Sequence, residues 1–76
     1  GLNWEYLPPL IEYYKKYTGK SSSIVDALHS IGVDSSFSHR KKIAKANGIK
    51  LYIGTAKQNN ELLKLLIKGK LIKEIN

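Results

Sequence analysis

The sequence predicts a small single domain that is mainly α-helical, with three to four short helices and at most one short two-stranded β element. Three observations predict this class. The chain has 76 residues, enough for one domain and too few for two. Apolar residues recur at helical spacing in several stretches, and a single glycine follows each stretch. The best candidate for a strand is the run 49–53, which has the apolar and β-branched composition that strands favour.

Two helices are expected in the first part of the chain. Pro8-Pro9 can occupy the first turn of a helix, where a missing N–H costs nothing, and the periodic apolar residues continue until Gly19. After a polar run, Ser23 is the expected N-cap of a second helix, with Asp26 completing a variant of the capping box. Gly32 should end this helix in a left-handed conformation.

A third helix is expected after the turn 33–36, which offers three candidate N-caps. In this helix Phe37, Ile43 and Ala44 should face the core, because they lie at helical spacing. The dipeptide Asn47-Gly48 is a strong stop signal. The helix should therefore span about ten residues.

The last and longest helix should begin at Thr55 and end before Gly69. Thr55 and Gln58 match the T-x-x-Q form of the capping box. Leucines spread around more than half of this helix, as expected of a central core helix or a subunit interface. A homo-oligomer is therefore among the expected partners. The tail 70–75 is expected to pair as a second short strand with 49–53.

Positive charge is concentrated in the C-terminal half of the chain. Up to His39 there are 3 basic and 4 acidic residues, and after it there are 10 and 2, for a formal net charge of +7. A one-sided positive field predicts a polyanionic partner. Nucleic acid, teichoic acid and anionic lipid all fit, and the alternative is that excess lysine only keeps a small domain soluble.

The composition indicates no enzyme, metal site or cofactor. Cysteine is absent, and two histidines on different expected helices cannot form a zinc site. The seven serines between 21 and 38 are what caps and turns require, and no glycine-rich phosphate loop is present. No apolar run approaches the roughly 18 residues of a transmembrane helix, and no signal-peptide pattern opens the chain. No membrane partner is expected, and the missing initiator Met suggests a piece of a longer protein.

A small basic helical domain that binds nucleic acid is the alternative. Two short helices around a turn, followed by the basic run 40–42, look like a helix-turn-helix. The spacing disfavours it, because five residues separate Ala27 from Gly32 and the turn 33–36 is long. Asp34 also lies where a phosphate backbone would approach.

Tyrosines dominate the aromatic residues. For Tyr13, Tyr14 and Tyr17 the expected role is packing of the first helix against the others. Tyr52 precedes a glycine and the expected cap of the last helix, which makes it the better candidate for a partly exposed recognition residue.

The segment from Tyr17 to Ile72, about three-quarters of the chain, carries a series of short motifs in a defined order. They are SIVDAL at 23–28, GVDSSF at 32–37, RKKIA at 40–44, NGI at 47–49, Y-x-G-T-A-x-Q-N at 52–59, and an L-L-x-L-L helix followed by GKLI. This ordered set resembles the C-terminal cell-wall-targeting domains of phage and prophage peptidoglycan hydrolases, those of N-acetylmuramoyl-L-alanine amidases from phages of Gram-positive bacteria in particular.

The resemblance implies a non-catalytic, cell-wall-binding domain over 17–76, with 1–16 as a linker or an extra N-terminal helix. Such a module holds an endolysin of the amidase type on the Gram-positive wall after phage lysis. The implied partners are the wall glycan or an anionic wall polymer, and the catalytic domain of the parent hydrolase. Wall binding is therefore favoured over nucleic-acid binding.

The candidate binding residues lie around the third helix and the start of the fourth. Arg40, Lys41 and Lys42 would meet wall phosphates or carboxylates, Arg40 through a bidentate pair. Directional hydrogen bonds or stacking would come from Ser36, His39, Tyr52, Thr55, Gln58 and Asn59. Pure capping is the competing interpretation for Thr55 and Gln58, and for His39 it is an exposed residue without a role.

Overall fold

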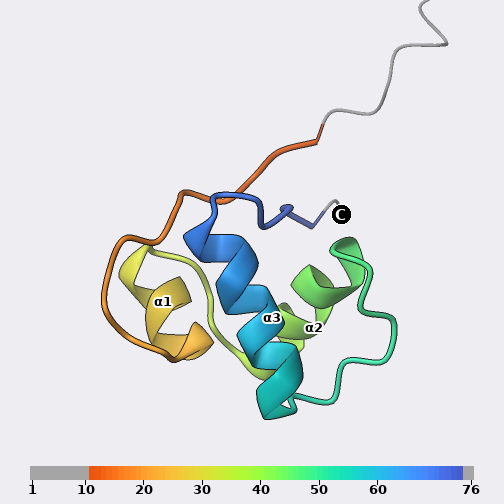
Figure 1. The fold of residues 1–76 in the computed structure, drawn as a ribbon. Coiled ribbons are helices and arrows are strands. Elements are labelled where there is room, and N and C mark those ends of the chain that lie inside the picture. The colour runs from red at the N-terminus through yellow and green to blue at the C-terminus, as the bar shows by residue number, and fades with distance from the viewer. Residues whose placement is uncertain (1–10, 75–76) are drawn as a thin grey trace, which may run out of the picture.

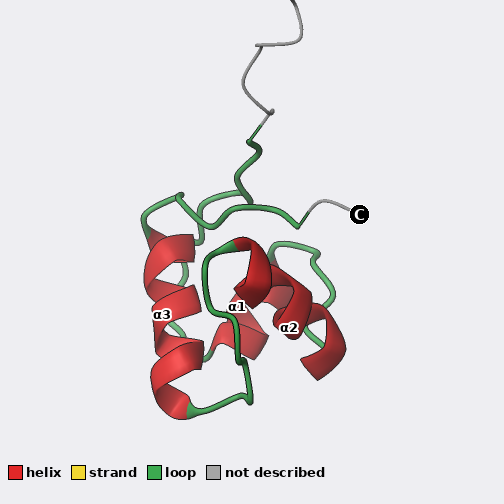
Figure 2. Ribbon diagram, turned by 90° about the vertical axis from the view of Figure 1, so that its right-hand side faces the viewer, coloured by secondary structure: helices red, strands yellow, loops and turns green. Residues whose placement is uncertain are grey.

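Three helices form the fold, which confirms the mainly α-helical class. In a computed structural model, residues 11–74 are described. The helices are α1 (Ile24–Ser30), α2 (Phe37–Ala46) and α3 (Ala56–Ile67), and the described residues contain no strand. In Figure 1 α3 lies in front of the other two helices, and Figure 2, turned by 90°, shows it at one side of the cluster. The fold is thus a small helical cluster in which α3 packs against α1.

The helices begin where the capping residues predict. The Ser23 hydroxyl accepts a hydrogen bond from the Asp26 N–H at 3.4 Å, and Ser36 caps α2 in the same way. At α3 both halves of the capping box form, because Thr55 Oγ1 accepts from the Gln58 N–H and the Gln58 side chain accepts from the Thr55 N–H. Each cap satisfies N–H groups that a helix start leaves without an intrahelical partner.

The core is built from one face of each helix and from side chains of the connecting segments. Its buried members are Tyr14, Tyr17, Ile24, Ala27, Leu28, Ile43, Ala44, Tyr52, Leu62, Leu63, Leu66 and Leu71. Four of the twelve therefore come from outside the helices. This distribution explains how a short chain encloses a core with helices of only 7, 10 and 12 residues.

The helix expected over 8–18 is wrong for residues 11–18, which are not helical. Residues 8–10 of that prediction lie outside the described residues. The Tyr14 N–H donates to the Leu71 carbonyl at 2.9 Å, and the Tyr17 N–H donates to the Leu66 carbonyl at 3.1 Å. These partners replace the intrahelical ones, so tertiary contacts override the local periodicity. The tyrosines still enter the core as expected, except Tyr13, which is 46% exposed.

The segment that replaces this helix runs beside the C-terminal tail. Tyr13 and Ile72 form an isolated antiparallel bridge, and the Lys73 N–H donates to the Glu12 carbonyl at 2.8 Å. The Asn47 side chain holds the tail from the other side, since it bonds both the N–H and the carbonyl of Ile72 at 2.9 Å. Figure 2 shows the two segments crossing one end of the helical cluster.

The strand expected over 49–53 is wrong, and so is its pairing with residues 70–74 of the tail; residue 75 of that prediction lies outside the described residues. The Gln58 side chain occupies the backbone groups that a neighbouring strand would need. Its Oε1 accepts from the Ile53 N–H at 2.9 Å, and its Nε2 donates to the Leu51 carbonyl at 2.8 Å. The segment is therefore a loop fastened to the start of α3 by a side-chain amide.

Candidate functional site

Arg40 holds the loop between α2 and α3, which spans residues 47–55. Its Nη1 donates to the Tyr52 hydroxyl at 2.8 Å and to Asn59 Oδ1 at 3.2 Å. Its Nε donates to the Ser35 carbonyl at 3.0 Å. The Tyr52 hydroxyl also donates to Asn59 Oδ1. The guanidinium group thus links the turn before α2, the loop and α3, a role that the interpretation of Arg40 as a phosphate ligand did not foresee.

Tyr52 is not the partly exposed recognition residue that the sequence suggested. Only 3% of it is accessible, because its ring lies against Phe37, with ring centroids 5.5 Å apart, and its hydroxyl belongs to the Arg40 network. Phe37 was expected to face the core, and this prediction is wrong, because the side chain is 48% exposed. The Arg40 guanidinium lies 5.8 Å from the Phe37 ring centre. The loop therefore buries the phenol of Tyr52, while the ring of Phe37 at the start of α2 stays partly exposed.

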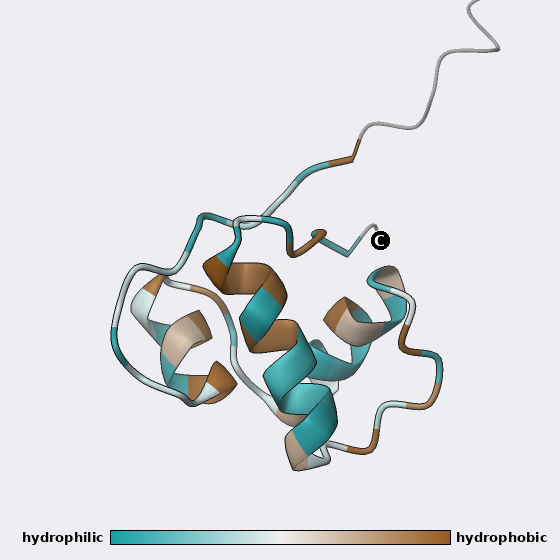
Figure 3. Ribbon diagram, viewed as in Figure 1, coloured by the Kyte–Doolittle hydropathy of each residue, from teal (hydrophilic) through white to brown (hydrophobic). Residues whose placement is uncertain are grey.

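Three apolar side chains remain exposed at this loop. Leu51 is 83% exposed and Ile53 is 72% exposed, on either side of the buried Tyr52. Phe37 completes the set, because its ring lies close to Gly54, where an added Cβ would be 3.1 Å from it. We call Phe37, Leu51 and Ile53 the apolar loop face. In Figure 3 parts of the loop joining α2 and α3 carry the hydrophobic colour.

Several other predicted site residues either cap a helix or are exposed on its surface. Thr55 and Gln58 cap α3, which confirms the capping interpretation, and Ser36 caps α2. Lys41 and Lys42 are exposed on α2 and available to anionic groups. The structure thus gathers most of the predicted site residues around one loop, but it uses them mainly to support that loop.

His39 packs against the C-terminal tail, so it is not an exposed helix residue without contacts. Its Nδ1 lies 2.6 Å from the Asp34 carbonyl oxygen, and its Nε2 contacts the Glu74 carboxylate. The Tyr14 hydroxyl donates to the other oxygen of that carboxylate. Glu74 therefore joins the N-terminal segment to α2.

Contacts in this region shift the pKa values of Tyr14, Asp34 and Glu74. Burial and the Glu74 carboxylate raise the pKa of the Tyr14 phenol above its ordinary value. Burial alone would raise the pKa of Glu74, but the hydrogen bond from Tyr14 and the contact with His39 outweigh it and lower the pKa. At Asp34 a hydrogen bond from the Ser36 N–H lowers the pKa. Glu74 is thus stabilised in its charged form.

Glu74→Gln is expected to weaken the domain at neutral pH and to change its acid sensitivity. A carboxylate with a lowered folded-state pKa adds stability above its unfolded-state pKa, and that stability is lost as the pH falls through the folded value. Gln keeps the oxygen that accepts from Tyr14 but removes the charge. Urea unfolding should show a wild-type advantage at neutral pH that shrinks below about pH 4. An unchanged difference at low pH would contradict this assignment. The pKa of Asp34 is lowered as well, but this residue is the same in the wild type and the variant. The difference between the two proteins therefore reports on Glu74.

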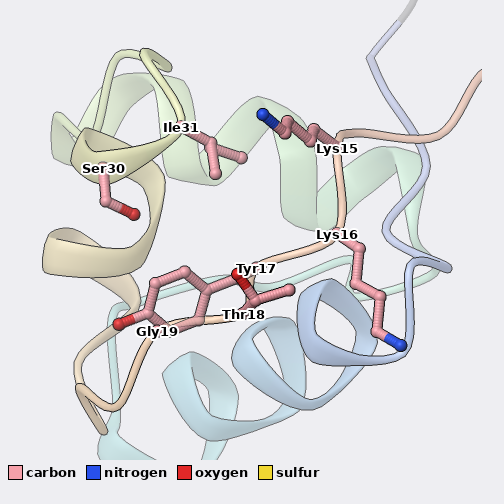
Figure 4. A pocket seen from close by; sticks show the side chains of 7 residues that line it. All are labelled: Lys15, Lys16, Tyr17, Thr18, Gly19, Ser30 and Ile31. Carbon is pink, nitrogen blue, oxygen red and sulfur yellow. The ribbon is translucent and has the colours of Figure 1, made fainter.

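A second surface feature lies between the N-terminal segment and the end of α1. A hollow of about 330 Å³ is lined by Lys15, Lys16, Tyr17, Thr18, Gly19, Ser30 and Ile31. Figure 4 shows the Tyr17 ring along one side, with Ser30 and Ile31 contributed by α1 and its end. Sequence reasoning missed this hollow because it placed residues 15–18 on a helix. The sequence feature that could have indicated it is the glycine two residues after Tyr17, because the tyrosine ring packs directly against Gly19.

Gly19→Ala is expected to destabilise the domain by about 1–3 kcal/mol, the usual cost of forcing an extra group into a packed site. A Cβ at Gly19 would overlap the ring and hydroxyl of Tyr17. Moving the ring would break the hydrogen bond that its hydroxyl accepts from the Ser21 N–H at 2.9 Å. Thermal unfolding measures the loss. Thr18→Ala, an exposed neighbour, should stay close to wild type. Equal stability of the two variants would contradict the packing argument.

Residues 11–74 contain neither a metal-ion cluster nor a membrane-spanning helix. No group of three or more His, Asp or Glu side chains there could hold a metal ion. None of the three helices is both long and apolar enough to cross a bilayer.

Two curated proteins of Listeria phages are similar to this chain. The L-alanyl-D-glutamate peptidase of Listeria phage A118 is 50% identical over 50 residues, which are 66% of this chain and 18% of that protein. The endolysin of Listeria phage A511 is 50% identical over 46 residues, which are 60% of this chain and 13% of that protein. The chain is related to phage endolysins. No family model and no solved structure matches it.

The comparisons support the relation to phage hydrolases that the motif series predicts. The aligned segment covers less than a fifth of the length of either relative.

Proposed function

We propose that this chain is a cell-wall-binding module that holds a phage endolysin on the Gram-positive envelope. The observation that carries the proposal is the similarity to short segments of two phage lytic enzymes, 18% and 13% of their lengths. A segment of this size in an enzyme several times longer suits a targeting role. The described residues support it further, because Lys41 and Lys42 are exposed on α2 and Arg40 and Gln58 hold the loop beside them in place.

The physical benefit of such a module is effective concentration. Once the module binds, the attached hydrolase meets its substrate as a nearly intramolecular partner, so a weak site is sufficient. The exposed lysines of α2 would add long-range attraction to anionic wall polymers. The module would act at the wall after phage lysis has released the enzyme.

The parent enzyme is proposed to cleave peptidoglycan. The motif series implies an N-acetylmuramoyl-L-alanine amidase, whereas the relative from phage A118 is named as an L-alanyl-D-glutamate peptidase. Both names describe cleavage at the wall peptide, at its junction with the sugar or inside it. The bond cleaved is decided by assaying the full-length parent on purified walls and identifying the new chain ends.

Co-sedimentation with purified Gram-positive walls tests the proposal. The chain should pellet with walls in the presence of excess duplex DNA, and a Lys41→Ala/Lys42→Ala variant should pellet less at low salt, where attraction to anionic polymers is strongest. Walls stripped of teichoic acid separate a peptidoglycan ligand from the anionic polymer. Failure to pellet, together with a mobility shift of DNA, would overturn the proposal in favour of nucleic-acid binding.

A further inference from the structure

The apolar loop face is held rigidly in a conformation that exposes it. Gln58 fixes the backbone of Leu51 and Ile53 through hydrogen bonds of 2.8 and 2.9 Å. The residue between them, Tyr52, is anchored in the core by Arg40 and Asn59. Two large aliphatic side chains are thus presented to solvent at 83% and 72% exposure by a loop that cannot easily turn them inward. Such pre-organisation reduces the entropy cost of binding.

The surroundings of this face are basic. Lys50 directly precedes Leu51 and is exposed, and Lys57 is exposed in the first turn of α3, which the capping box joins to the loop. The Arg40 guanidinium lies 5.8 Å from the Phe37 ring centre. A partner for this face should therefore combine small apolar groups with negative charge.

The polar groups best suited to sugar recognition are already engaged here. The Tyr52 ring is buried, and its hydroxyl bonds Asn59 and Arg40. The Gln58 amide is used on both sides by the loop backbone. Sugar rings need directional hydrogen bonds and flat aromatic faces, and at this loop only Phe37 offers an open ring. The exposed groups suit a peptide with aliphatic side chains better than a glycan strand.

We infer that the apolar loop face binds the peptide stems of the cell wall, short acidic peptides that contain alanine. Alanine methyl groups would pack on Leu51 and Ile53, and the peptide carboxylates would meet Lys50 and Lys57. The inference deepens the wall-binding proposal and rests on it. A second copy of this chain fits less well, because two basic rims repel each other and three side chains fall far below the roughly 800 Å² per partner of a stable interface.

Titration of the isotopically labelled 76-residue chain with soluble wall fragments tests the inference. The probes are a disaccharide bearing its peptide stem, the free stem peptide, and the stem-free disaccharide. The first two should shift the amide signals of residues 50–54 with similar Kd, and the third should not. The variants Leu51→Ser and Ile53→Ser should each weaken binding about tenfold, as loss of one well-packed apolar contact does. Ile67→Ser, 44% exposed at the other end of α3, is the matched control.

The outcomes separate this inference from the proposal beneath it. Shifts produced by the stem-free disaccharide or by teichoic acid alone would overturn the peptide assignment, while wall binding would stand. Shifts that depend on protein concentration without a probe would assign the face to a second copy and overturn the inference. Unchanged wall pelleting by the folded Leu51→Ser/Ile53→Ser variant would also overturn it. A wild-type chain that does not pellet with walls at all would remove the wall-binding proposal itself.

Discussion

Arg40→Ala is expected to lower the free energy of unfolding by about 2–3 kcal/mol and to abolish wall binding. Hydrogen bonds from a charged group are worth about 1.5–3 kcal/mol, and this guanidinium makes three, to Ser35, Tyr52 and Asn59. Its loss also frees the loop that presents the apolar face. Urea unfolding measures the first effect, and wall pelleting of the folded fraction measures the second.

Two further variants separate support of the loop from contact with the ligand. Arg40→Lys keeps the charge but cannot reproduce the forked geometry, so it should lose most of the same stability. Lys41→Ala removes an exposed charge beside it and should leave stability within about 0.5 kcal/mol of wild type. If Arg40→Lys restored both stability and binding, the side chain would be a point-charge ligand contact rather than a structural link.

Leu66→Ala is expected to cost about 2–5 kcal/mol, enough to unfold much of the population of so small a domain. Leu66 is fully buried in α3, and its carbonyl accepts the N–H of Tyr17, so the cavity would open where the helix meets the N-terminal segment. The loss would be a cooperative one, since the core is a single cluster. Chemical denaturation monitored by circular dichroism gives the value.

The adjacent residue supplies the control for this change. Ile67→Ala removes the same number of carbon atoms as Leu66→Ala, but from a side chain that is 44% exposed, so it should cost much less. A similar loss at both positions would mean that Ile67 is buried in solution, as it would be if a second copy of the chain packed on α3. Sedimentation analysis would then identify the covering copy.

The helix boundaries were predictable because capping is local. The side chains of Ser23, Ser36 and Thr55 each meet an N–H three residues later, so sequence spacing alone defines them. The segments 11–18 and 49–53 were not predictable in this way. Their backbone partners, such as the Leu71 carbonyl and the Gln58 amide, are chosen by tertiary packing.

The sequence grouped Arg40, Tyr52 and Asn59 in one region but gave no sign of the hydrogen bonds that join them. Arg40, Tyr52 and Asn59 do come together, although 19 residues separate the first from the last. Sequence shows which polar groups are present but not which of them are already engaged by the fold. The exposed side chains of Leu51 and Ile53 escaped notice because an apolar run was assigned to a strand, where one side would have been buried.

For the proposed wall-binding module, the pairing of the N-terminal segment with the tail defines the shortest piece of chain that can be moved from one enzyme to another. A recombination joint at residue 17, where the motif series begins, would leave behind the Glu12 carbonyl bonded to Lys73, the Tyr14 N–H bonded to Leu71, and the phenol bonded to Glu74. A chimera that inherits the domain intact must carry the chain from residue 12 onward. The transferable unit is therefore longer at its N-terminal side than the run of shared motifs.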